Sequence, residues 1–146
     1  MSTKYILSGG YANEVNSIND SFFREIIKGT SDSVNILVIM FAKTGNDIRR
    51  FYDITKDQFE RNRKDKKITY RLASTESLAS DIAESQIIYI HGGETIKLIE
   101  DMEEFSEFLQ LIKGKIVAGE SAGAYLLASK FICESIGFVH DGTGAL

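Results

Sequence analysis

The chain has 146 residues, of which 43% are hydrophobic and 26% are charged, a balance typical of one globular domain over residues 1–146. The net charge of −4, with both signs interspersed, argues against a nucleic acid or an anionic membrane as partner. The single cysteine, Cys133, excludes an internal disulfide and fits a reducing compartment. We expect a cytoplasmic protein, because the first residues lack the apolar core of a signal peptide and no apolar run approaches membrane-spanning length.

Short apolar runs alternate with amphipathic stretches in the first half of the chain. Residues 5–7 predict a strand, and residues 15–27 carry apolar side chains at helical spacing. Residues 36–41 form a continuous apolar run, which is typical of a strand covered on both faces. Apolar positions over residues 48–59 predict a second helix. The basic residues at 61–67 fit the solvated C-terminal end of that helix better than a phosphate site.

The second half continues the same alternation. Residues 68–72 alternate and indicate an edge strand, and a short helix is expected around residues 78–82. Residues 87–90 predict another buried strand, residues 96–112 one long acidic helix, and residues 116–118 a further strand. This order predicts an α/β fold, with a mostly parallel sheet of about five strands and helices on both faces.

The most informative motif is Gly-Glu-Ser-Ala-Gly at residues 119–123. It follows a predicted strand and precedes a helical pattern, which is the context of the Gly-x-Ser-x-Gly turn that presents a serine nucleophile. Glycines flank such a serine because a Cβ at either position would clash in the sharp turn. We therefore expect Ser121 to be a nucleophile with a strained backbone and an accessible Oγ. The alternative is an ordinary strand-to-helix turn.

A second glycine motif, His-Gly-Gly at residues 91–93, also follows a strand. Ligands of parallel sheets lie beyond the carboxyl ends of the strands, and one strand–helix–strand unit separates the two motifs, so we expect them to be neighbours. Acyl transfer by serine requires N–H donors aimed at the developing oxyanion. The Ala122 N–H is one candidate donor, and the N–H of Gly92 or Gly93 is the second. A tight turn without such a role is the alternative for the glycine pair.

Together, residues 89–95 (Tyr-Ile-His-Gly-Gly-Glu-Thr) and residues 119–124 (Gly-Glu-Ser-Ala-Gly-Ala) resemble the serine peptidase family that contains dipeptidase E and cyanophycinase. That family carries Gly-Gly-(Asn/Asp)-Thr one βα unit before Gly-x-Ser-Ala-Gly-(Ala/Ser), and Glu94 departs from this pattern. The resemblance implies a class I glutamine-amidotransferase-like fold, which has flavodoxin-like three-layer architecture. It further implies hydrolysis of small peptides, with Ser121 as nucleophile and residues 92–93 as the oxyanion segment.

A serine nucleophile needs a base, and the chain has two histidines. As base, His91 would have to share the strand end that supplies the oxyanion donors, so a packing role is favoured. His140 follows Ser121 closely enough for a loop to bring it back. The resemblance implies a third solution, a histidine on a strand after a Gly-Leu-Gly-Leu-like segment. Residues 142–146 resemble that segment, so we expect the catalytic histidine beyond Leu146 and a chain that is incomplete at its C-terminus.

The remaining candidate residues have less support. Glu134 and Asp141 are candidates for the acidic partner by distance along the chain only, and each also fits a surface carboxylate. Cys133 is expected to be a buried structural cysteine rather than a nucleophile. No cluster of His, Cys and Asp has metal-ligand spacing, so we expect neither a metal nor another cofactor.

Three functions are compatible with these patterns. The first is a serine peptidase acting on small peptides. The second is an esterase-like α/β-hydrolase, suggested by His-Gly-Gly, although that fold needs a longer chain after the nucleophile. The third is a non-catalytic remnant or partner-binding domain that kept the fold and lost the base. An incomplete sheet would leave an open edge, so self-association into a homo-oligomer is also expected.

Overall fold

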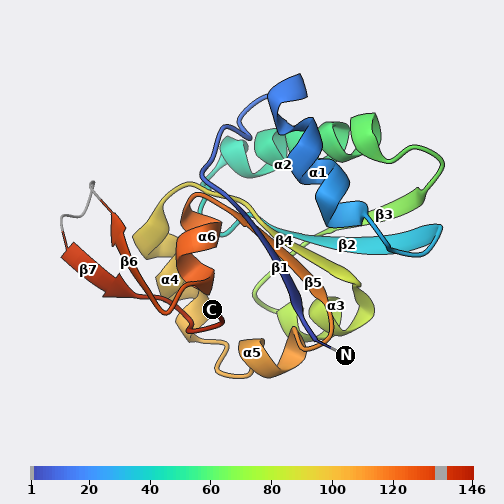
Figure 1. Ribbon diagram of the computed structural model, residues 1–146. Coiled ribbons are helices and arrows are strands. Elements are labelled where there is room, and N and C mark those ends of the chain that lie inside the picture. The colour runs from blue at the N-terminus through green and yellow to red at the C-terminus, as the bar shows by residue number, and fades with distance from the viewer. Residues whose placement is uncertain (1, 134–137) are drawn as a thin grey trace.

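The computed structural model describes residues 2–133 and 138–146 (Figure 1). A five-stranded sheet has the order β1-β5-β4-β2-β3, and every strand pair in it is parallel. Its strands are β1 (Lys4–Ser8), β2 (Ser33–Ile39), β3 (Lys67–Leu72), β4 (Ile87–Ile90) and β5 (Ile116–Glu120). The helices are η1 (Ser17–Asn19), α1 (Asp20–Ile27), α2 (Asn46–Asn62), α3 (Leu78–Glu84), α4 (Thr95–Glu103), α5 (Phe108–Leu111) and α6 (Ala122–Leu127). The predicted α/β class is confirmed.

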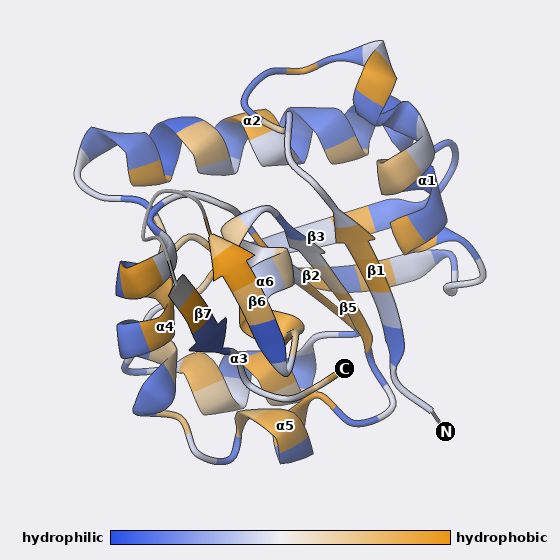
Figure 2. Ribbon diagram, turned by 60° about the vertical axis from the view of Figure 1, so that its left-hand side comes forward, coloured by the Kyte–Doolittle hydropathy of each residue, from blue (hydrophilic) through white to orange (hydrophobic). Residues whose placement is uncertain are grey.

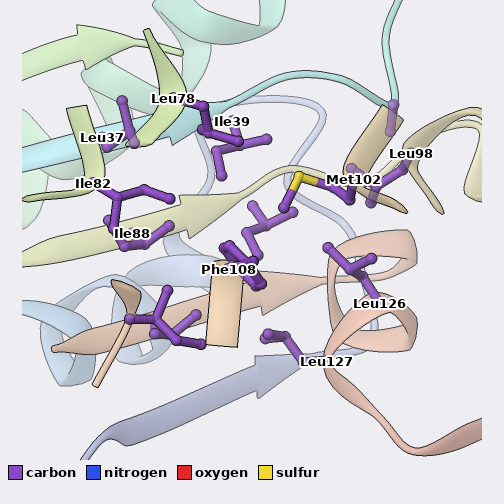
Figure 3. Close-up of a cluster of buried hydrophobic side chains, with 14 of the residues drawn as sticks. Leu37, Ile39, Leu78, Ile82, Ile88, Leu98, Met102, Phe108, Leu126 and Leu127 are labelled. Carbon is purple, nitrogen blue, oxygen red and sulfur yellow. The ribbon is translucent and has the colours of Figure 1, made fainter. Parts of the chain in front are cut away.

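Helices cover both faces of the sheet. In Figure 1, α1 and α2 lie on one side and α3, α4, α5 and α6 on the other. Side chains alternate along each strand, so Val38 and Tyr89 pack toward α1 and α2, whereas Ile39 and Ile88 pack toward α3–α6. Figure 3 shows the second of these clusters, in which Met102 and Phe108 meet the strand side chains. The central strands β2 and β4 contribute buried apolar side chains to both faces, while α2 shows blue hydrophilic patches along its length in Figure 2.

The register of the central strands determines where the site forms. Ile90 of β4 pairs with Gly119 of β5, and Ser8 of β1 pairs with Glu120. The carboxyl ends of β1, β5 and β4 therefore lie side by side. The two glycine motifs lie at the carboxyl ends of β4 and β5. Because these two strands are adjacent in the sheet, the motifs are neighbours, as expected.

The first predicted helix begins later than its apolar spacing indicates. Val15 and Ile18 are 44% and 75% exposed, and α1 starts at Asp20. The Asn16 side chain accepts a hydrogen bond from the Ile18 N–H at 2.9 Å, which stabilises the short turn η1 ahead of the helix. The second strand is also shifted: β2 runs from Ser33 to Ile39 rather than over residues 36–41.

The long acidic helix predicted over residues 96–112 is wrong, because the structure has two helices there. α4 ends at Glu103, and α5 covers only Phe108–Leu111. Glu103 and Glu104 place negative charge at the carboxyl end of α4, where the helix dipole disfavours it. The turn after α4 also allows Phe108 to become buried, at 2% exposure, against the sheet.

The sequence patterns did not predict the antiparallel hairpin that follows α6. It consists of β6 (Lys130–Cys133) and β7 (Phe138–Asp141), and it lies beside α4 and α6, away from the main sheet (Figure 1). Cys133 is buried as expected, although on a strand. In the described part of the chain, no helix has the length and apolar character needed to cross a membrane.

Candidate active site

Ser121 occupies the sharp turn between β5 and α6. Its backbone has φ 49° and ψ −114°, a conformation that residues with a Cβ rarely adopt. Its N–H donates to the Ser8 carbonyl at 2.9 Å, and its own carbonyl accepts from the N–H groups of Ala124 and Tyr125. Hydrogen bonds to β1 and to α6 therefore hold Ser121 in this strained conformation. The side chain is half-buried, and its Oγ has no hydrogen-bond partner among the described residues.

The glycines around Ser121 are required by close backbone approach. A Cβ on Gly119 would lie 2.6 Å from the backbone of Gly123, and a Cβ on Gly123 would lie 2.3 Å from the Ile90 carbonyl oxygen. Both distances are shorter than any ordinary contact, so α6 could not pack against β5 and β4 with larger residues there. The flanking glycines of the motif thus fix α6 against the sheet.

Gly92 packs directly against the serine. A Cβ built on Gly92 would lie 2.8 Å from Ser121 Cβ and 2.9 Å from the Glu120 carbonyl oxygen. Gly93 has φ 151°, and a Cβ there would lie 2.3 Å from the Ala42 carbonyl oxygen, which also accepts from the Glu94 N–H. The segment at residues 92–93 is therefore fixed between Ser121 on one side and Ala42 on the other.

The candidate oxyanion donors differ in their partners. The Gly92 N–H donates to Glu120 Oε1 at 2.8 Å, so this group is already engaged. The N–H groups of Gly93 and Ala122 have no hydrogen-bond partner within residues 2–133 and 138–146. Of the two glycines considered from the sequence, Gly93 is the one whose donor is available.

Glu120 and His91 form a buried pair beneath this segment. Glu120 is 3% exposed and His91 is fully buried. His91 Nδ1 lies 3.0 Å from Glu120 Oε1 and 2.9 Å from the Gly92 carbonyl oxygen. Both neighbours are acceptors, so Nδ1 carries a proton and donates to them. The Phe51 ring packs 5.4 Å from the imidazole, which closes the pair off from solvent.

The environment keeps the Glu120 carboxyl ionised. Burial raises the pKa of this carboxyl, but the hydrogen bond and charge of His91, the Gly92 N–H and the charge of Lys43 together lower it by more. The net effect is a pKa below the ordinary value of 4.5. The Lys43 ammonium also lies 4.0 Å above the Phe51 ring, the same ring that packs against the His91 imidazole.

Neither histidine contacts the serine hydroxyl. His91 uses Nδ1 as described, and His91 Nε2 has no hydrogen-bond partner among the described residues. His140 lies on β7, stacked at 5.5 Å on Phe131, which in turn stacks on Tyr125 of α6. No hydrogen bond joins either ring to Ser121 in the described part of the chain.

The other candidates have different surroundings. Asp141 is exposed and pairs with Lys130 at 2.6 Å, as expected of a surface carboxylate. Glu134 lies outside the described residues. Over residues 2–133 and 138–146, no group of three or more His, Cys, Asp or Glu side chains is arranged to hold a metal ion.

A hollow of about 270 Å³ lies at the carboxyl ends of β2 and β3, and Lys43 is among its lining residues. Ser121 also lies at the carboxyl ends of the strands, at the end of β5. A larger one, of about 500 Å³, lies at the opposite edge, between the end of α1 and the turn after α2. Its lining side chains include Lys28 and Asp32, and it contains none of the residues around Ser121. Size alone therefore does not locate the site.

Glu120 is a residue of the candidate site that the two glycine motifs did not indicate. Ile90 pairs with Gly119, so the next residues of the two strands, His91 and Glu120, are level with each other. The sequence contained a signal for this pair: Glu120 and His91 each follow the last paired residue of adjacent buried strands, and a buried carboxylate needs a polar partner.

Comparison with known proteins identifies the family of the chain. The model of peptidase family S51 matches residues 5–141. The chain belongs to peptidase family S51. This confirms the resemblance drawn from the two glycine motifs. A search of curated protein sequences finds no match to the chain.

Solved structures show the same fold as this S51 chain. A peptidase from an acI-B1 Actinobacterium superposes with a TM-score of 0.70 at 17% identity, over 99% of this chain and 65% of its own. A candidate peptidase E protein from Listeria monocytogenes superposes with a TM-score of 0.66 at 15% identity, over 100% of this chain and 76% of its own. The S51 chain thus spans about two thirds to three quarters of the length of these structures.

Proposed function

We propose that the chain carries the nucleophile and the oxyanion site of a serine peptidase that hydrolyses small peptides. The observation that carries this proposal is Ser121 itself, strained at φ 49° and with no hydrogen-bond partner for its Oγ in the part of the chain that the structure describes. Ser121 Oγ attacks the scissile carbonyl carbon, and the N–H groups of Ala122 and Gly93 stabilise the oxyanion that forms. Membership of a peptidase family supports the reaction class.

The proposed reaction needs a base to take the proton of Ser121 Oγ, and neither His91 nor His140 is placed to do so in the described structure. His91 Nδ1 is held by Glu120 and Gly92, His91 Nε2 has no hydrogen-bond partner among the described residues, and the His140 ring stacks on Phe131. Without a base the Ser121 hydroxyl keeps its proton and reacts slowly. We expect the 146-residue chain alone to hydrolyse peptides near the background rate.

Chemical rescue tests this proposal. Free imidazole can take the serine proton if the oxyanion site and the nucleophile are already in place. We expect imidazole to accelerate acylation by p-nitrophenyl acetate or a fluorophosphonate, with the adduct on Ser121 by mass spectrometry. Ser121→Ala should abolish this rate, and Ser129→Ala, an exposed serine just beyond α6, should leave it unchanged.

The lack of a base contact favours a second candidate function, a non-catalytic domain that retains the fold. It predicts no Ser121-dependent acylation at any imidazole concentration. A rate that is the same in the unmodified chain and in Ser121→Ala would establish this second function and reject the first.

A further inference from the structure

We infer that Glu120 is a positioning residue, which acts through His91 and the Gly92 backbone to keep the Gly93 N–H directed out of the protein interior beside Ser121. This inference rests on the proposed function, because the Gly93 N–H matters only if Ser121 forms an oxyanion. It assigns a task to a buried carboxylate that the nucleophile motif itself does not require.

The first step is that both polar groups of the Gly92 backbone are bound by side chains. The Gly92 N–H donates to Glu120 Oε1 at 2.8 Å, and the Gly92 carbonyl accepts from His91 Nδ1 at 2.9 Å. Glu120 Oε1 also accepts from the same Nδ1 at 3.0 Å, so the carboxylate orients the imidazole that binds the carbonyl. Removing the carboxylate therefore releases both ends of one residue.

The second step concerns the peptide between Gly92 and Gly93. The structure has no cis peptide bond among its described residues, so the C=O and N–H of this planar unit point in opposite directions. The carbonyl points toward the fully buried His91. The Gly93 N–H must then point away from the interior, and Gly93 is exposed.

The third step is that this segment needs an external restraint. Two consecutive glycines have more accessible backbone conformations than any other pair, and Gly93 already adopts φ 151°. Gly92 cannot gain a stiffening Cβ, since that atom would lie 2.8 Å from Ser121 Cβ. Packing against Ser121 and Ala42 limits where the segment lies, and the hydrogen bonds from the buried side chains set how its peptide is oriented. A preorganised donor is what oxyanion stabilisation requires.

The buried pair does not fit the alternative role of a catalytic base and its acid. Glu120 is 3% exposed and His91 is fully buried, and neither makes a hydrogen bond to Ser121 Oγ in the described residues. His91 Nδ1 donates to Glu120 and to the Gly92 carbonyl, while Nε2, the nitrogen that would have to act as base, is buried and has no hydrogen-bond partner among the described residues. The geometry is that of a support for the backbone.

Three variants distinguish a loss of Gly92 positioning from a general loss of stability. Glu120→Gln keeps an oxygen acceptor for the Gly92 N–H, and Glu120→Leu keeps the size but has no acceptor. Asp81→Leu is the matched control, because Asp81 is also a buried carboxylate, 5% exposed and paired with Arg71 and Ser77 far from Ser121. Urea unfolding ranks the stability of the three.

Two readouts are measured on each variant. Amide hydrogen exchange of Gly92, taken relative to the core amide of Ile88, should accelerate by at least about tenfold in Glu120→Leu. It should change little in Glu120→Gln or Asp81→Leu. The imidazole-rescued acylation rate at saturating ester should fall on the order of 100-fold in Glu120→Leu. It should stay within about threefold in Glu120→Gln and in Asp81→Leu.

Unchanged Gly92 protection in Glu120→Leu would overturn the inference, as would an equal rate loss in Asp81→Leu. If the unmodified chain shows no Ser121-dependent acylation, the proposed function fails, and the exchange readout still decides whether Glu120 fixes Gly92. If Glu120→Leu does not fold, the unmodified chain provides the test by NMR. The Gly92 amide proton should shift together with the side-chain carboxyl carbon of Glu120 during an acid titration, and independent behaviour would overturn the inference.

Discussion

Gly92 shows how much one missing methyl group matters at the residue scale. A Cβ there would lie 2.8 Å from Ser121 Cβ and 2.9 Å from the Glu120 carbonyl oxygen, and neither atom can move without distorting the strained turn. We expect Gly92→Ala to lower the free energy of unfolding by about 1–3 kcal/mol, the usual cost of overpacking. Urea unfolding measures this change.

Gly9 provides the matched control for that substitution. A Cβ on Gly9 would meet nothing within 4 Å. Gly9→Ala should therefore change the free energy of unfolding by no more than about 0.5 kcal/mol. Equal stability losses in the two variants would show that the close approach of Gly92 to Ser121 is not what makes glycine necessary.

The pKa of Glu120 leads to a pH dependence of stability. Burial raises this pKa, but His91, the Gly92 N–H and Lys43 together hold it below 4.5 in the folded protein. A carboxyl with a depressed folded-state pKa stabilises the fold fully above its unfolded pKa, and this contribution disappears as pH falls through the folded pKa. The stability gap between the unmodified chain and Glu120→Gln should therefore shrink between about pH 7 and about pH 3.

Urea unfolding of both proteins across this range checks the prediction. Other carboxylates, such as Asp20 beside Arg61, also respond to acid, but they are present in both proteins and cancel in the difference. A gap that stays constant with pH would show that folding does not lower the pKa of Glu120.

At the scale of elements, the contact between α6 and the sheet depends on backbone touching backbone. A Cβ on Gly123 would lie 2.3 Å from the Ile90 carbonyl oxygen. Gly123→Ala must therefore displace α6 from β4, and we expect a loss of about 3 kcal/mol or more in stability. Ala124→Ser, one residue along the same helix at a half-buried position, should cost less than about 1 kcal/mol. Thermal unfolding followed by circular dichroism compares the two.

Elements with one dominant local signal could be predicted from the sequence, and elements set by competing signals could not. Residues 87–90 are apolar without interruption, and β4 covers exactly this buried run. Residues 96–112 also keep apolar residues at helical spacing, but the acidic end of α4 and the burial of Phe108 divide the run. The hairpin pairs residues 130–133 of β6 with residues 138–141 of β7, and helical spacing does not encode such a contact.

At the scale of the whole molecule, the positions of the two glycine motifs followed from βα order, whereas their hydrogen bonds did not. The order predicts that the motifs meet, and Gly92 does touch Ser121. Which N–H is engaged depends on the side chain of Glu120, a residue that the motif pattern leaves unspecified. Sequence patterns thus predicted that the two motifs meet, and only three-dimensional geometry showed that the Gly92 N–H is engaged by a side chain.

The outer edge of β1 leads to a prediction about association. In the described residues β1 pairs only with β5, and Leu7 on it is 44% exposed. Unpaired strand edges with apolar side chains recruit other strands. We expect the 146-residue chain to self-associate in light scattering as its concentration rises, and Leu7→Lys to reduce this association while keeping the unfolding midpoint. A strictly monomeric chain at millimolar concentration would contradict this expectation.

The contact between Glu120 and Gly92 also constrains how relatives of this chain can diverge. A carboxylate at position 120 is tolerated in the interior because the Gly92 N–H donates to it. A Cβ on residue 92 would lie 3.1 Å from Glu120 Oε1, so this arrangement favours glycine at position 92. Relatives that keep an acid at position 120 should therefore keep histidine at 91 and glycine at 92, whereas those with an apolar or hydroxyl residue at 120 are free to vary at 91. The three positions are expected to change as one inherited unit.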